Sequence, residues 1–167
     1  MYRRIGFYAE DIRFQLCFAR QRKTASWLAK VVRCERHRLE RVDFVFCSDA
    51  ALHQRNWRHL QHDTFTDVLT FDHASTAQTV EGDVYISVER VAENARALER
   101  RFLQELNTVM LHGLLHLMGY DDHTVPEVAI MRRKEAFYEH LYDKKEHNAT
   151  QKHSGTDTRL ATMCLSR

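Results

Sequence analysis

Two histidines separated by four positions are the residues of this sequence best placed to do chemistry. His112 and His116 lie in the segment LHGLLHLMGYDDH. On a helix such residues lie one turn apart on the same face, so their imidazoles can share one metal ion. Gly119 tolerates left-handed backbone and favours a turn at the helix end. That turn can bring Asp122 or His123 toward the ion, and three protein ligands with one open position are typical of catalytic zinc sites.

The same histidine pair also has a purely structural interpretation. Imidazoles four residues apart occur by chance on many helices as a half-buried polar edge. The apolar content of residues 103–118 favours the metal, because a helix this rich in leucine, valine and methionine is expected to be buried. Imidazoles in a buried helix need polar partners, and one ion provides a partner for both.

The residue that follows the first histidine separates this segment from the metallopeptidase helix. In the H-E-x-x-H motif this position is a glutamate that acts as general base. Here it is Gly113, which has no side chain. A hydrolase built on this helix therefore activates water through the metal or through a group from elsewhere in the chain.

Four segments in the same order resemble the YbeY family of bacterial metal-dependent endoribonucleases. The segment HGLLHLMGYD, which begins at His112, is similar to the family signature. Upstream, DTFTDVLTF (63–71) resembles the family's PTDVLSF segment, and EGDVYIS (81–87) resembles its GDI-x-IS segment. Downstream, MRRKE (131–135) resembles an M-x-x-x-E pattern. The resemblance covers roughly residues 40–142.

This resemblance implies an α+β fold of zincin-like arrangement. The function implied is zinc-dependent, single-strand-specific RNA hydrolysis in ribosomal RNA maturation, including processing of the 16S 3′ end. One Zn²⁺ per chain would be the cofactor, and ribosomal RNA and the small ribosomal subunit would be the partners. Positive side chains near the cleft would hold the RNA phosphates, so binding is expected to weaken with salt.

The sequence departs from the family pattern at two positions. The family's third ligand is a histidine at the place held here by Asp122, and the histidine comes one residue later, at His123. The register without an insertion favours Asp122, whose carboxylate is an acceptable zinc ligand, and a one-residue bulge would give the role to His123. The family also carries a basic residue where this chain has Leu60. Arg58, two residues earlier, is the candidate for an RNA phosphate contact.

Two carboxylates precede and enter a predicted strand. Asp63 and Asp67 lie on either side of Thr66. One interpretation is structural, with Asp63 capping a turn and Asp67 at a strand edge. The functional interpretation places both carboxylates at the metal cleft, with Asp67 as a catalytic candidate beside the metal ligands His112 and His116.

Composition limits the classes of protein that this chain can be. Its 167 residues suffice for one domain with a substantial core, and 44% hydrophobic with 29% charged residues is usual for a globular protein. The net charge of +2 requires any RNA site to be a local basic patch. The four cysteines form no C-x-x-C pair, which argues against a zinc ribbon and fits a reducing cytoplasm. No signal peptide or membrane-length apolar run is present, so neither secretion nor a membrane span is expected.

The elements that must position these residues follow from periodicity. Strands are predicted at 3–8, 41–47, 66–72 and 82–88, and helices at 24–35, 49–60, 88–101, 103–118 and 126–143. The first strand–helix–strand unit is long enough for a parallel crossover, and the short loop after residue 72 favours an antiparallel pair. The expected fold is α+β with a mixed sheet of about four strands. Residues 1–143 form the single predicted domain, and the polar residues 144–167 are expected to be a disordered tail.

Two other functions remain compatible with the sequence. One is a metal-dependent hydrolase of a small or peptide substrate, which Gly113 argues against. The other is a non-catalytic ribosome-assembly factor in which the metal only braces the fold. An open or closed fourth coordination position would distinguish catalysis from bracing.

Overall fold

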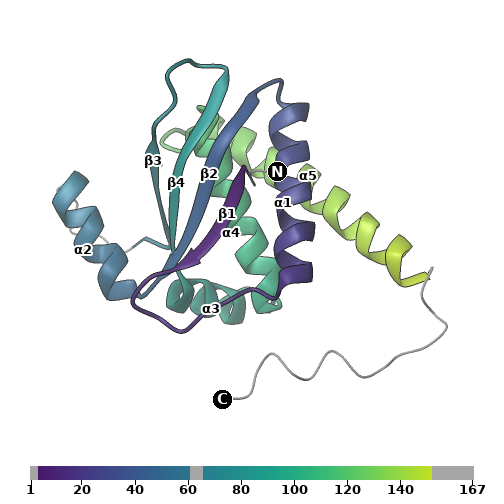
Figure 1. Cartoon of the computed structure of the whole chain (residues 1–167), viewed down its shortest axis with the longest axis horizontal. Coiled ribbons are helices and arrows are strands. Elements are labelled where there is room, and N and C mark those ends of the chain that lie inside the picture. Colours follow the sequence, from purple (N-terminus) through teal and green to yellow (C-terminus); the bar gives the residue numbers. More distant parts are fainter. Residues whose placement is uncertain (1–3, 61–65, 152–167) are drawn as a thin grey trace.

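A four-stranded mixed sheet forms the centre of the computed structural model, which describes residues 4–60 and 66–151 (Figure 1). The strands are β1 (Ile5–Ala9), β2 (Arg38–Cys47), β3 (Val68–Asp72) and β4 (Thr79–Ser87), in the spatial order β1-β2-β4-β3. β2 runs parallel to both β1 and β4, and β3 runs antiparallel to β4. The predicted parallel unit and the predicted antiparallel pair are both confirmed.

Five helices complete the described part of the chain. They are α1 (Phe18–Cys34), α2 (Asp49–Leu60), α3 (Val88–Ala97), α4 (Phe102–Leu117) and α5 (Val125–Gln151). The predicted α+β class with about four strands is therefore confirmed. None of these helices is both long and apolar enough to span a membrane.

The alternation of side chains along the strands assigns the helices to the two faces of the sheet. Val84 and Ile86 of β4 belong to the main core, which α1, α4 and α5 share with the sheet. Tyr85, between them, points to the opposite face and packs in a smaller cluster with Leu52 of α2 and Leu69 of β3. Successive strand residues face opposite sides, so α2 lies on the second face, where it is the one helix of the described part of the chain (Figure 1).

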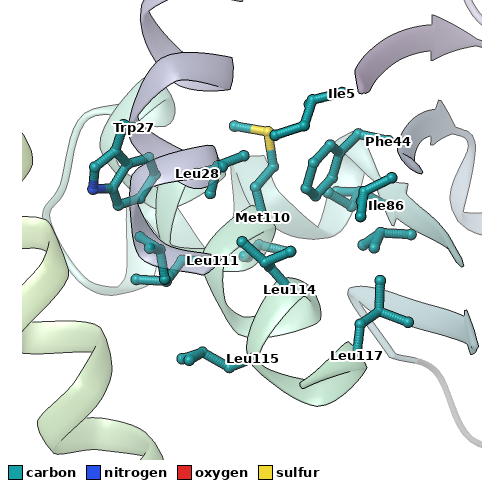
Figure 2. Close-up of a cluster of buried hydrophobic side chains, with 14 of the residues drawn as sticks. Ile5, Trp27, Leu28, Phe44, Ile86, Met110, Leu111, Leu114, Leu115 and Leu117 are labelled. Carbon is teal, nitrogen blue, oxygen red and sulfur yellow. The ribbon is translucent and has the colours of Figure 1, made fainter. Parts of the chain in front are cut away.

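α4 is the central helix of the main core. Met110, Leu111, Leu114 and Leu115 are fully buried. Figure 2 shows α4 side chains between the aromatic and aliphatic residues of α1 and those of the sheet. Each such side chain contributes on the order of 1.5–3 kcal/mol by burial. The helix that carries the two histidines is therefore firmly anchored along its length.

Two helix boundaries differ from the sequence-based prediction by more than four residues. α1 begins at Phe18 rather than at residue 24, and Thr24 is fully buried inside the helix. α5 runs to Gln151 rather than ending near residue 143, because its polar segment contains good helix formers such as lysine, glutamate and alanine. Residues 152–167 of the predicted tail, and Asp63, lie outside the described residues. The domain division at residue 143 stays a prediction.

Candidate metal centre

The two histidines converge on one point at the C-terminal end of α4. The His112 and His116 side chains are about one-fifth exposed, and their ring planes are nearly perpendicular, at 86°. Their Nε2 atoms are 2.9 Å apart. This is the arrangement that the four-residue spacing predicted.

A left-handed turn after α4 returns the chain to the histidines. Gly119 has a φ of +85°, a conformation that strains residues with a side chain. Asp122 then places one carboxylate oxygen 3.6 Å from His112 Nε2 and the other 3.9 Å from His116 Nε2. His123 lies outside this group of ligand atoms and faces Glu127 at the start of α5 instead. The geometry brings Asp122 to the pair, as the ungapped register predicted.

The outer nitrogens of the two rings have partners that fix their protons. Glu135 of α5 accepts a hydrogen bond from His112 Nδ1 over 2.7 Å. His116 hydrogen-bonds the backbone of Tyr120, and because its Nε2 faces His112, Nδ1 is the atom that donates. Both Nε2 atoms then point at the same space, where either a proton shared between them or a metal cation can lie.

The spacing of the three ligand atoms fits such a cation. Ligand atoms around tetrahedral zinc lie about 3.3–3.6 Å apart. The two Nε2 atoms are 2.9 Å apart, and the two Asp122 oxygens lie 3.6 Å from His112 Nε2 and 3.9 Å from His116 Nε2, respectively. One ligand atom from each of the three residues lies within 4.8 Å of the other two. His112, His116 and Asp122 therefore form a possible metal site with two nitrogen ligands and one oxygen ligand.

The two imidazoles have opposite pKa shifts. Burial lowers the pKa of His112, but the hydrogen bond and charge of Glu135, with the charges of Asp122 and Asp67, outweigh burial and raise it overall. Burial lowers the pKa of His116, and the neighbouring His112 lowers it further. His112 is thus the more basic ring, as expected for a histidine held by a carboxylate.

A cleft of about 370 Å³ opens beside the histidines between α4, α5 and the start of β3. Its charged lining consists of His112, Arg132 and four carboxylates, those of Asp67, Glu105, Asp122 and Glu135. Such a cleft would repel a phosphodiester unless cations offset the carboxylates. A metal ion bound by His112, His116 and Asp122 would supply positive charge beside these carboxylates.

Asp67 lines the cleft directly before β3, which places it where the functional interpretation expected it. Asn94 of α3 donates a hydrogen bond of 2.9 Å to its Oδ2. The backbone N–H of Ser87 donates to the Asp67 carbonyl and fixes its main chain. Oδ1 of Asp67 has no hydrogen-bond partner among the described residues, which leaves it available to a bound molecule.

Glu105 is a second carboxylate of the cleft, two turns before His112 on α4. It is buried, and burial raises its pKa although Arg100 pairs with it over 3.0 Å. Arg100 also pairs with Glu139 of α5. Through these ion pairs Arg100 links α4 to α5, the two helices that form the cleft walls.

The loop that carries Asp122 is anchored through Tyr120. The Tyr120 hydroxyl donates to Glu35, at the end of α1, over 2.6 Å. Lys134 donates to the same Glu35 oxygen over 2.6 Å, and the Tyr138 hydroxyl donates to its other oxygen. This cluster ties the ligand loop to α1 and to α5, the helix of Glu135. Tyr120 thus has a structural role in holding the ligand loop.

Gly113 explains why the metallopeptidase glutamate is absent. A Cβ atom at this position would lie 2.5 Å from Val84 Cγ1 and 3.2 Å from Val68 Cγ2. The helix lies against β3 and β4 at this residue, and a glutamate would be driven into the sheet rather than into the cleft. A proton acceptor has to come from another element.

The predicted RNA-contacting residue lies apart from the cleft. Arg58 is exposed near the end of α2, on the second face of the sheet, and does not line the cleft. The structure thus does not bring Arg58 to the metal ligands. Its contact with RNA stays a prediction.

Several residues of the site were not identified from the sequence. Arg132 and Glu135 were visible only as members of the MRRKE segment, without a role, and Asn94 had no local signal. Their distance from the histidines depends on how α3 and α5 pack against α4. The M-x-x-x-E pattern was the one signal that could have pointed to Glu135.

Comparison with known proteins places the chain in a family. The family model "Endoribonuclease YbeY" matches residues 11–143. Endoribonuclease YbeY of Amoebophilus asiaticus is 46% identical over 134 residues, covering 80% of this chain and 90% of that protein. Its counterpart in Christiangramia forsetii is 39% identical over 131 residues, covering 78% and 89%. The solution structure of TM1509 from Thermotoga maritima matches the fold with a TM-score of 0.61 at 24% identity, covering 93% of this chain and 99% of that one.

The fold and the site define a zincin-like hydrolase, with a sheet packed on a helix that carries the two histidines of the possible metal site. The chain belongs to the YbeY family, a family of metal-dependent endoribonucleases. The resemblance inferred from the motifs and the enzyme class that it implied, a hydrolytic nuclease, are both confirmed.

Proposed function

We propose that this protein is a zinc-dependent endoribonuclease that cleaves single-stranded RNA during ribosomal RNA maturation. The observation that carries the proposal is the convergence of His112, His116 and Asp122 at the edge of an open cleft, in a chain of the YbeY family. Two imidazole nitrogens and one carboxylate oxygen suit Zn²⁺, which prefers such mixed sets in catalytic sites.

The residues of the cleft divide the chemistry among them. When bound, zinc supplies a Lewis acid for a phosphate oxygen and acidity for a water molecule. Glu135 keeps the proton of His112 on Nδ1, so that Nε2 stays free to bind the metal. Asp67, oriented by Asn94, is our candidate for accepting the proton of the attacking water through its free Oδ1.

The shape of the site supports unpaired RNA as the substrate. The cleft has a volume of about 370 Å³, enough to admit part of a single strand. Single-stranded RNA can splay its bases and bring a phosphate close to the ligands at the cleft, whereas a duplex presents its backbone only as a rigid outer surface. We propose the 3′ end of 16S ribosomal RNA as the target and the small ribosomal subunit as the partner.

The cytoplasm is the proposed compartment, because ribosomal RNA is matured there. The described cysteines Cys17, Cys34 and Cys47 are all free thiols, which suits a reducing environment.

Two alternatives have less support. A peptidase of the usual kind needs a glutamate where Gly113 packs against Val84. A purely structural metal is usually enclosed by four protein ligands, whereas the described cluster has three and the Asp122 side chain is 38% exposed. Both features favour catalysis on an extended substrate.

The test uses purified zinc-loaded protein with a labelled RNA that is offered either as a single strand or annealed to its complement. We expect cleavage of the single strand at least about tenfold faster than of the duplex, and loss of cleavage on addition of a chelator. A His116→Ala variant handled identically controls for contaminating nucleases. Equal cleavage of both substrates, or activity that survives the chelator and the substitution, would overturn the proposal.

A further inference from the structure

The cleft beside the metal ligands has one permanently cationic side chain among the described residues that line it. Arg132, in the second turn of α5, shares this lining with Asp67, Asp122 and Glu135. The other candidate for a phosphate contact, Arg58, lies on α2 and does not reach the cleft. An RNA strand entering the cleft would therefore meet Arg132 beside the metal.

Arg132 makes no hydrogen bond or ion pair with the described residues, although carboxylates surround it. Glu135, one helical turn away, is the nearest acidic residue in the sequence, but it is already bonded to Nδ1 of His112. The two cations that follow are engaged elsewhere. Arg133 donates to the carbonyl of Ala129, and Lys134 donates to Glu35. Of three consecutive basic residues, only Arg132 is exposed at the cleft with its guanidinium uncommitted.

An uncommitted guanidinium suits a phosphodiester better than any other group of the cleft. Its planar fork of N–H donors matches two phosphate oxygens, and it stays charged at every pH at which the enzyme works. Its position on α5, the helix that also supports His112 through Glu135, places it at the same cleft as His112 and Asp122. Because the Arg132 side chain is exposed, its guanidinium stays hydrated until the substrate binds.

We propose that Arg132 binds a phosphate of the RNA strand and aligns it with the metal ligands His112, His116 and Asp122. This assignment rests on the proposed endoribonuclease function and names the substrate contact of that same site. Arg132 binds the strand directly, whereas the metal ligands and Asp67 carry out the chemistry. Its loss should therefore weaken substrate binding more than it slows the chemical step.

The experiment compares Arg132→Ala, Arg132→Lys and the adjacent control Arg133→Ala, all zinc-loaded. Cleavage of a short labelled single-stranded RNA is followed with protein in excess, which separates the half-saturating protein concentration from the maximal rate. The series is repeated between about 50 and 200 mM salt. Log affinity falls with log salt, and each lost phosphate contact makes this negative slope shallower by about 0.7 for a single strand. Zinc content is measured for every variant.

We expect Arg132→Ala to raise the half-saturating concentration about tenfold or more and to reduce the salt slope by about 0.7, with zinc content unchanged. Arg132→Lys should keep the salt slope but recover only part of the affinity, because an ammonium lacks the fork. Arg133→Ala should stay within about twofold of the parent protein.

Two results would overturn the assignment, and they differ in what else they affect. If the parent protein cleaves RNA but Arg132→Ala matches Arg133→Ala in half-saturation and salt slope, Arg132 is not the phosphate contact and the nuclease proposal stands. If the zinc-loaded parent protein neither binds nor cleaves single-stranded RNA, the proposed function fails and the assignment fails with it.

Discussion

The hydrogen bond between Glu135 and His112 should control how tightly the centre holds its metal. The two side chains are 18% and 23% exposed and meet at 2.7 Å, so solvent screens the contact only weakly. Carboxylates that support a metal-binding histidine typically contribute a factor of 10–100 to metal affinity, or about 1.4–2.8 kcal/mol. A single hydrogen bond to a charged group contributes about 1.5–3 kcal/mol, and the two estimates agree.

We therefore expect Glu135→Gln to weaken zinc binding about tenfold and Glu135→Ala to approach a hundredfold. Glutamine still accepts the proton of Nδ1 but lacks the charge, whereas alanine removes both. Zinc affinity is measured by competition with a chromophoric chelator at about pH 8, where most histidines are neutral and protons compete little.

Glu139→Gln is the matched control for this experiment. Glu139 lies one turn further along α5 and bonds Arg100 and Thr108 rather than a histidine. Its substitution should leave zinc affinity within about threefold, even if the protein is less stable. If Glu135→Gln and Glu139→Gln bind zinc equally, the contact with His112 does not tune the metal and the reasoning is refuted.

Three further predictions follow from the geometry of single residues. Asp122→Ala should lower zinc affinity more than His123→Ala, in the same competition assay, and the reverse order would return the ligand role to His123. Hydrogen bonds from Lys134, Tyr120 and Tyr138 outweigh burial and lower the pKa of Glu35 below its ordinary 4.5. The ionised Glu35 therefore stabilises the folded protein above pH 4.5, and this stabilisation is lost as the pH falls through the lowered pKa. The difference in unfolding free energy between parent and Glu35→Gln, measured with urea, should be larger at neutral pH than in acid, and a pH-independent difference would contradict this. Burial raises the pKa of Cys47 to about 12, so native protein at about pH 8 should resist iodoacetamide there while exposed Cys17 reacts, and equal labelling by mass spectrometry would disprove it.

Local periodicity was enough to predict the centre of the site. The spacing of His112 and His116 needs only a regular helix to place both rings on one face, and Gly119 needs only a turn to return Asp122. Strand pairing followed from connection lengths, since a helix joins the parallel strands β1 and β2 and a short loop joins the antiparallel strands β3 and β4.

Contacts between distant elements could not be predicted in this way. Whether Glu135 faces His112 or solvent depends on the rotation of α5 about its own axis, which is set by the packing of residues such as Met131 and Tyr138. The same rotation of α5 determines that Arg132 lines the cleft. Each distance is a property of the assembled core, and no local pattern specifies it.

Helix ends were uncertain for a related reason. Thr24 has the residue type of a helix cap, but burial against the core overrides that preference and the helix continues through it. The polar segment after residue 143 lacks apolar periodicity, yet α5 continues to Gln151 through good helix formers such as lysine and glutamate. In both places tertiary packing or composition decided what the local signal left open.

The most direct test of the account is a zinc titration of the chelator-stripped protein, followed by cleavage of single-stranded RNA. We predict no cleavage without metal, a rate that rises with added zinc, and a break near one zinc ion per chain. The folded double variant His112→Ala, His116→Ala should neither bind zinc at this site nor cleave. Stripped protein that cleaves as fast as loaded protein, or a double variant that keeps its zinc and its activity, would contradict the central claim.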